Sequence, residues 1–94
     1  MIIKGTTKSG FEFAVDEKAP QSWGFLEAAV KLQKGDLTGA VEMVDILFPG
    51  EQKKRFLAHI STLDPSVPTS LVTSECDAVI NAMAALKKSS PSQD

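Results

Sequence analysis

The chain has 94 residues, of which 43% are hydrophobic and 23% charged, and its formal net charge is −2. This length and composition predict one folded domain with a thin core and exclude wholesale disorder. The acidic balance argues against a nucleic-acid partner. No apolar run approaches the roughly 20 residues of a membrane-spanning helix, and the N-terminus lacks the order of a secretion signal. We therefore expect a protein of a reducing cytoplasm.

Residues 1–16 predict a β-hairpin. Phe11, Phe13 and Val15 alternate with other side chains, which is the period of a half-buried strand, and Ile2-Ile3-Lys4 forms a short apolar strand before them. Lys8-Ser9-Gly10 supplies turn chemistry between the two, because glycine readily takes a positive φ. An isolated hairpin is marginal in water, so its apolar face must pack on the helices that follow.

Two amphipathic helices are expected next. Pro20 suits the turn into the first helix, Ser22 is its candidate N-terminal cap, and Gly35 is a natural stop. Asp36 then caps the second helix, which ends at Pro49-Gly50. The apolar stripes of the two helices are Trp23, Leu26 and Val30; Phe25, Ala29 and Leu32; and Leu37, Ala40, Val41, Val44, Leu47 and Phe48.

Two more helices complete the predicted fold. The third runs from Glu51 to Leu63, and the fourth opens at Val67-Pro68-Thr69, with Thr69 or Thr73 as its cap. Their apolar residues are Phe56, Leu57 and Ile60, and then Leu71, Val72, Cys76, Val79, Ile80, Met83 and Leu86. We predict a mainly α fold in which the hairpin at about residues 1–16 precedes three to four short packed helices. The domain spans residues 1–88, and residues 89–94 form a mobile polar tail.

Few residues in the chain are suited to catalysis or to metal binding. His59 and Cys76 are the single histidine and the single cysteine, and the chain has no tyrosine. His59 lies at the edge of an apolar stripe and is interpreted as a structural or surface residue. Cys76 lies on the apolar stripe of the last helix, where a thiol acts as a small hydrophobe, and its acidic neighbours raise its pKa. We expect no enzyme activity, no cofactor and no metal site.

Charged clusters have ordinary explanations. Lys53-Lys54-Arg55 is interpreted as a solvated helix face and not as an anion site. The acidic pairs Asp16-Glu17 and Glu75 with Asp77 are interpreted as caps or partners of helix dipoles.

Trp23 and Phe25 lie about 200° apart on one helix, at ~100° per residue, so a single small core cannot hold both in one place. Either one packs under the hairpin and the other on the helices, which is the favoured interpretation, or one is exposed and anchors a partner. Counted together, the apolar faces exceed what a chain of this size can bury, which indicates a protein-binding module that self-associates or holds an apolar helix. The predicted partner-binding residues are Trp23, Phe25, Leu26, Val72, Val79 and Met83.

The order of these features resembles the tail assembly chaperones of long-tailed bacteriophages and prophages. The resemblance runs from residue 1 to about residue 86. It rests on the stretches Ile2-Ile3-Lys4-Gly5, Gly10 through Asp16, Trp23-Gly24-Phe25-Leu26-Glu27, Lys34-Gly35-Asp36, Leu47 through Phe56, and Val67-Pro68-Thr69. The stretch from Leu47 is similar to the family's Leu-Leu-Gly-Glu-Gln step, with Phe48-Pro49 where a leucine pair is commoner.

The resemblance implies a binding protein of the host bacterial cytoplasm that is absent from the mature virion. Such chaperones bind the long tape measure protein and keep it soluble while tail tube subunits polymerise. In many relatives a ribosomal frameshift adds a second domain that recruits the tube protein, and Lys87-Lys88 is codable by an A-rich slippery run.

Two other functions compete with this one. The first is a small structural phage protein of the head–tail joining type, or another helical interaction module. A DNA-binding protein is suggested by the short turn between the second and third helices, although the acidic balance opposes it.

Overall fold

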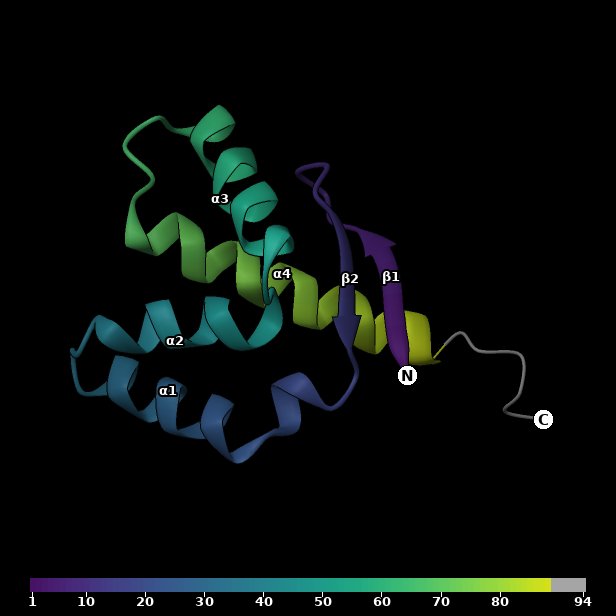
Figure 1. The fold of residues 1–94 in the computed structure, drawn as a ribbon, viewed down its shortest axis with the longest axis horizontal. Helices are drawn as coiled ribbons and strands as arrows, with labels where there is room; N and C mark the ends of the chain where they lie inside the picture. The colour runs from purple at the N-terminus through teal and green to yellow at the C-terminus, as the bar shows by residue number, and fades with distance from the viewer. Residues whose placement is uncertain (89–94) are drawn as a thin grey trace.

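The computed structural model describes residues 1–88, so the tail predicted to be mobile, residues 89–94, lies outside the described part. Over the described residues the chain is mainly helical, with an antiparallel hairpin followed by four packed helices, which confirms the predicted fold class (Figure 1). The elements are β1 (Ile2–Thr6), β2 (Glu12–Asp16), the 3₁₀ helix η1 (Ala19–Gln21), α1 (Trp23–Gln33), α2 (Thr38–Leu47), α3 (Glu51–Leu63) and α4 (Thr69–Lys88).

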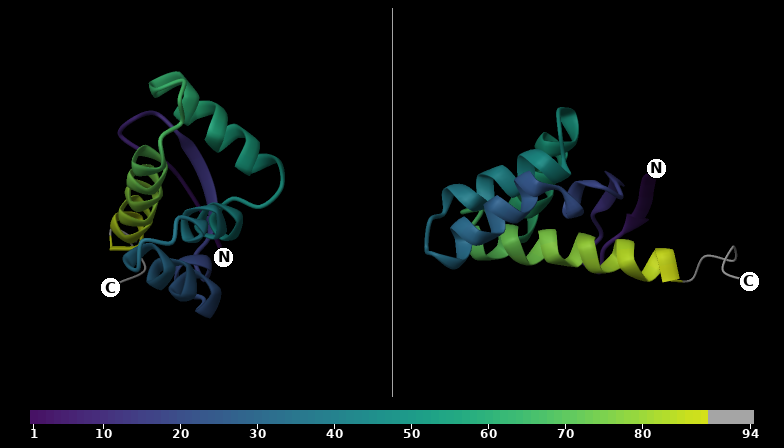
Figure 2. Two further views of the ribbon diagram at one scale, coloured as in Figure 1. Left: turned by 90° about the vertical axis from the view of Figure 1, so that its left-hand side faces the viewer. Right: turned by 90° about the horizontal axis from the view of Figure 1, so that it is seen from below.

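The long helix α4 organises the other elements. It runs the length of the described fold, and β1 packs on its C-terminal part while α2 packs nearer its start (Figure 2). Helix α1 contacts α2 and lies on the side of α2 that faces away from α3 (Figure 1). Helix α3 starts beside the hairpin and rises steeply away from α4 (Figure 1).

Most of the predicted helix and turn signals act locally as expected. The hydroxyl of Ser22 accepts a hydrogen bond from the Phe25 N–H at 3.2 Å, which caps α1. Gly35 ends the helix with a φ of +84°, a conformation that favours glycine. The Asp36 carboxylate accepts from the Thr38 hydroxyl and from the Thr38 N–H at 3.0 Å, and these bonds lower the pKa of Asp36. The predicted cap of the second helix lies one residue too early, however, because α2 begins at Thr38 and Leu37 holds its cap position.

The predicted caps of α4 are wrong. The helix begins at Thr69, and the Pro68 carbonyl accepts from the backbone N–H groups of Leu71 and Val72. The hydroxyl of Thr73 donates to the Ser70 carbonyl within the helix, so it caps nothing. The chain enters through Val67, whose φ of +48° is rare for a β-branched residue.

Three phenylalanines join the hairpin to the helices. Phe48 stacks on Phe56 with ring centroids 4.4 Å apart, and Phe11 meets both rings edge-on at 5.6 and 5.3 Å. Phe48 and Phe56 are fully buried. Phe48, which directly precedes Pro49, therefore supplies a ring that closes the core at the junction of α2 and α3.

The Gln52 side chain holds α3 against the edge of the hairpin. Its carbonyl oxygen accepts from the Ala14 N–H at 2.7 Å, and its amide donates to the Ala14 carbonyl at 2.8 Å. These two bonds resemble the pairing of a neighbouring strand. They give the N–H and C=O groups of Ala14 hydrogen-bond partners at the open edge of β2.

Helices α1 and α2 approach closely at Gly39. A Cβ atom added there would lie 2.3 Å from the Ala28 carbonyl oxygen, which is closer than real Cβ atoms approach, and 3.1 Å from Leu32, which is a tight contact. Ala28 is fully buried at the same crossing. Small residues on both helices thus let the two backbones pack tightly.

Gly39→Ala should therefore destabilise the fold, although alanine is the better helix former. Separating α1 from α2 disturbs a packed core, and we expect the free energy of unfolding to fall by about 1–3 kcal/mol in urea denaturation. Gly24→Ala is the control, since a Cβ there meets only Ile46 at 3.4 Å. That substitution should leave stability unchanged or raise it by up to ~1 kcal/mol. Equal behaviour of the two variants would contradict the close crossing.

Candidate protein-binding site

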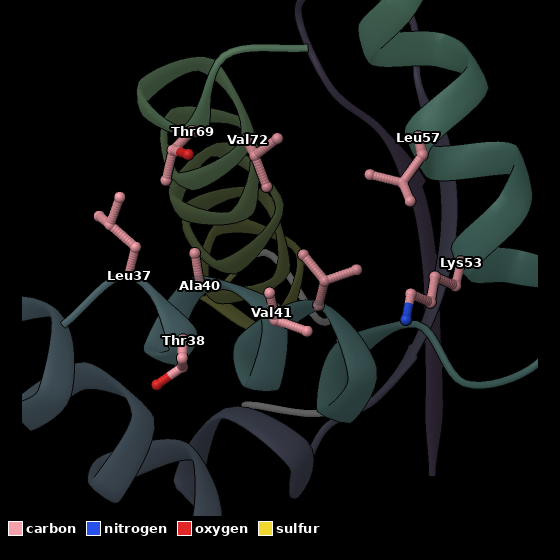
Figure 3. Close-up of a pocket in the computed structure, with 9 residues that line it drawn as sticks. Leu37, Thr38, Ala40, Val41, Lys53, Leu57, Thr69 and Val72 are labelled. Atoms are coloured by element: carbon pink, nitrogen blue, oxygen red, sulfur yellow. The ribbon is translucent and has the colours of Figure 1, made fainter.

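An apolar groove opens where α2, α3 and the start of α4 meet. Its volume is about 360 Å³, and we call it the α2–α3–α4 groove (Figure 3). Its lining residues are Leu37, Thr38, Ala40, Val41, Val44, Lys53, Leu57, Thr69 and Val72. Helix α2 forms its floor, and Leu57 of α3 and Val72 of α4 point toward each other across it (Figure 3).

The rim of this groove is open and its floor is buried. Leu37 and Val41 are 60% and 57% exposed, whereas Val44 and Val72 are buried. Lys53 is the one charged residue among those that line the groove, and its ammonium pairs with the Asp45 carboxylate at 2.6 Å. The groove therefore offers a water-exposed apolar surface with a cation at one side.

A second exposed apolar surface lies on α1. Trp23, Leu26 and Val30, here called the α1 stripe, are 72%, 52% and 38% exposed. Phe25 faces the opposite way and is buried. The prediction that the two aromatics diverge is confirmed, but the favoured interpretation, with both in the core, is wrong. The reason is that α1 has only the α2 side of the fold to pack against.

The structure divides the six predicted partner-binding residues into two groups. Trp23 and Leu26 are exposed, and Val72 forms a buried part of the α2–α3–α4 groove. Phe25, Val79 and Met83 are wrong as surface residues, because they belong to the buried core. The hairpin and α2 cover the apolar face of α4 that carries Val79 and Met83.

Sequence reasoning missed the residues that open the groove, namely Leu37, Val41 and Leu57. The signal was the width of the apolar set on the second helix, whose positions 37 and 41 lie at the edge of the stripe that holds the buried Ala40 and Val44. A stripe that wide exceeds what one neighbouring helix can cover.

A polar network ties the hairpin turn to α3 and α4. The Glu75 Oε2 atom accepts from the hydroxyls of Thr7 at 2.6 Å and Ser9 at 2.8 Å. His59 Nε2 lies 2.9 Å from the Ser9 oxygen, and its ring packs 5.5 Å from Phe11. The capping role predicted for Glu75 is thus wrong, since this side chain is only 6% exposed and holds the turn. His59 has a structural contact, as predicted.

This network is not arranged as a nucleophile and base. The single hydroxyl proton of Ser9 is donated to Glu75, so the contact with His59 needs the histidine to be the donor. A general base must instead accept the proton of its nucleophile. The network instead holds the hairpin turn against α3 and α4.

The basic run on α3 is solvated and paired, as predicted. Lys54 pairs with Glu51 at 3.2 Å, and both side chains are largely exposed. Arg55 is exposed and lies 5.8 Å from the centre of the Phe11 ring. Asp16 accepts from the Lys18 N–H at 2.9 Å and so caps the turn after β2.

Within residues 1–88, no three or more His, Cys, Asp or Glu side chains are placed to hold a metal ion together. In the same range, no helix combines the length and apolar character needed to cross a membrane.

Comparison with known protein families, curated proteins and solved structures found no match to this chain. The function of the groove and of the α1 stripe therefore has to be inferred from their own geometry.

Cys76 is held as an inert thiol inside α4. It is 1% exposed, and burial, with smaller contributions from Asp77 and Glu75, raises its pKa from 9.0 to about 12. Because only the thiolate reacts readily, thiol reagents should label the folded chain at pH 8 no faster than it unfolds.

The same shift predicts a loss of stability at high pH. Below pH 9 the thiol is protonated in both states, but between pH 9 and about 12 only the unfolded chain loses the proton. The free energy of unfolding should then fall by about 1.4 kcal/mol per pH unit from this group alone. Urea denaturation of wild type and Cys76→Ala checks this. The variant should lack that part of the slope, and equal slopes would contradict the burial of the thiol.

Proposed function

We propose that this chain is a protein-binding module that holds the apolar face of a helix from another protein in the α2–α3–α4 groove. The open apolar groove is the observation that carries the proposal. A small-molecule pocket buries most of its ligand, whereas here Leu37 and Val41 are more than half exposed along the rim. An exposed apolar groove between helices suits the side-chain row of an amphipathic helix.

Charge indicates one more property of the client helix. Lys53 lies on one side of the groove, where its partner Asp45 is itself half-exposed. A client carboxylate at that side can share the ammonium, while most of the other lining residues are apolar and favour apolar side chains. The expected client is therefore an apolar helix face flanked by an acidic residue.

We further propose that the chain is a phage tail assembly chaperone whose client is the tape measure protein. The support is the resemblance over residues 1 to about 86, together with a groove suited to a long helical client. On this proposal the chain acts in the host bacterial cytoplasm and leaves before the virion is complete. A longer frameshifted form would recruit the tail tube protein.

Co-expression with the tape measure protein encoded by the same genome tests the proposal. We expect the client to stay soluble and to co-purify with the chain. The double variant Leu37→Gln, Val41→Gln should lower the retained client by at least about tenfold, because both side chains lose apolar contact with it. Both positions are exposed, so the variant should keep its helical circular dichroism spectrum and its unfolding midpoint.

Leu63→Gln is the matched control, since Leu63 is 46% exposed and does not line the groove. It should retain the client as wild type does. A client that stays insoluble and does not co-purify would contradict the chaperone function. Detection of the chain in purified virions by mass spectrometry would favour a structural head–tail component instead.

A further inference from the structure

The two edges of the hairpin differ in what covers them. β2 lies between β1 and α3, so β1 forms the outer edge of the two-stranded sheet (Figure 1). The edge on β2 is closed, because Gln52 bonds both backbone groups of Ala14 and the Arg55 guanidinium donates to the Glu12 carbonyl at 3.5 Å. Within residues 1–88, no side chain bonds the backbone of β1 in this way, so its outer edge is open.

The strand register shows which backbone groups lie on this open edge. Lys4 is directly opposite Ala14, whose N–H and C=O point away from β1 toward Gln52. The two residues thus form a non-hydrogen-bonded pair, and the N–H and C=O of Lys4 point away from β2. The backbone groups of Ile2 and Thr6, two residues to either side, point the same way. These three residues therefore present a row of donors and acceptors that suits pairing with another strand.

A hollow of about 550 Å³ lies beside the end of this edge, and we call it the β1–α4 hollow. Its lining residues are Thr6, Thr7, Lys8, Ser9, Glu75, Ala78, Asn81 and Ala82. One wall is thus the end of β1 with the hairpin turn, the other is α4, and no lining residue belongs to β2 or α3. Ala78 and Ala82 are neighbours on α4, and their small side chains leave room for an apolar side chain of an added strand.

Charge identifies the kind of strand that fits. Lys4 and Lys8 are both exposed, and the ion pairs described at the hairpin involve Met1 and Lys87 instead. Glu75, the acidic residue of the hollow, is buried and already accepts two hydroxyl hydrogen bonds. The open edge is therefore cationic. Pairing of β1 with a copy of itself about Lys4 would set two ammonium groups opposite each other, which is unfavourable, whereas a carboxylate opposite Lys4 is favourable.

We propose that the open edge of β1 binds an extended segment of a partner protein as a third strand, with an acidic residue opposite Lys4. Side chains alternate along a strand, so the acidic residue shares the solvent face of Lys4, and the residues before and after it face α4. Those two residues are apolar, because one of them enters the β1–α4 hollow over Ala78 and Ala82. Main-chain bonds then give affinity, and the alternate side chains give specificity. The proposal does not rest on what the α2–α3–α4 groove binds.

A titration of the ¹⁵N-labelled full chain with two capped peptides tests the proposal by NMR. The first peptide has one aspartate between two valines within a run of threonines, and the second has lysine in place of the aspartate. We expect a Kd on the order of 100 µM for the aspartate peptide and weaker binding of the lysine peptide. At 1 mM aspartate peptide, amide exchange at Lys4 and Thr6 should slow about tenfold. The Gly5 amide points toward β2 and should change less.

Two variants test the charge and the backbone contact separately. Lys4→Glu should raise the Kd of the aspartate peptide about fivefold and lower that of the lysine peptide, because the cross-strand charge is reversed. Lys34→Glu is the matched control, since Lys34 is exposed near the end of α1, and it should change neither Kd. Thr6→Pro removes an N–H on the open edge but none that bonds β2, so it should abolish binding while the helical circular dichroism spectrum is kept.

Three outcomes would overturn the proposal. The first is equal binding of the two peptides, or equal effects of Lys4→Glu and Lys34→Glu. The second is a set of shifted amides that lies on the α2–α3–α4 groove and not on β1. The third is slowing of exchange at Lys4 and Thr6 with rising protein concentration and no peptide, which would identify a second copy as the added strand. Lys4→Glu changes an exposed side chain, so the test stands even if Thr6→Pro does not fold.

Discussion

The contact among Phe11, Phe48 and Phe56 is the constraint on which the rest of the fold depends. A two-stranded hairpin is marginal alone, and here it shares a core with the helices: β1 packs on α4, and the Phe11 ring packs against rings from the α2–α3 junction and from α3. The Gln52 amide adds the backbone of β2 to the same contact. Helix α3 is thereby held against the hairpin, and its side facing the start of α4 is left uncovered. The α2–α3–α4 groove is the space that results.

The other half of the molecule follows from the crossing of α1 and α2. Gly39 and Ala28 let the two backbones approach closely, and the inner face of α1 packs on α2 and the core. Phe25 points into that contact. No described element lies on the outer side of α1, so Trp23, Leu26 and Val30 remain exposed. The tight packing of the inner face on α2 therefore leaves the α1 stripe on the outer side of the helix, which no described element covers.

Local signals were enough to predict the elements and their order. Ser22, Gly35 and Pro49-Gly50 act through their own backbone neighbours, so their effect can be derived from a short stretch of sequence. The burial of Glu75 could not be predicted in this way, because its hydrogen-bond partner Thr7 lies 68 residues away. The exposed residues of the candidate site could not be predicted from local signals either. Helical periodicity predicts an apolar stripe, but which edge of it is covered depends on crossings such as the one at Gly39. For this reason Val79 and Met83 are core residues, and Leu37 and Val41 line the groove.

Separation of the two exposed apolar surfaces has a consequence for how they act together. The α2–α3–α4 groove and the α1 stripe share no residue, so one can be occupied while the other is free. On the proposed function, several copies of the chain bind along one client helix, whose repeated apolar faces enter one groove each. Linked contacts of this kind raise the affinity for an extended client without strengthening any single groove. A shallow groove that is used several times along the client is then suited to holding a long helix firmly while each single contact stays easy to release.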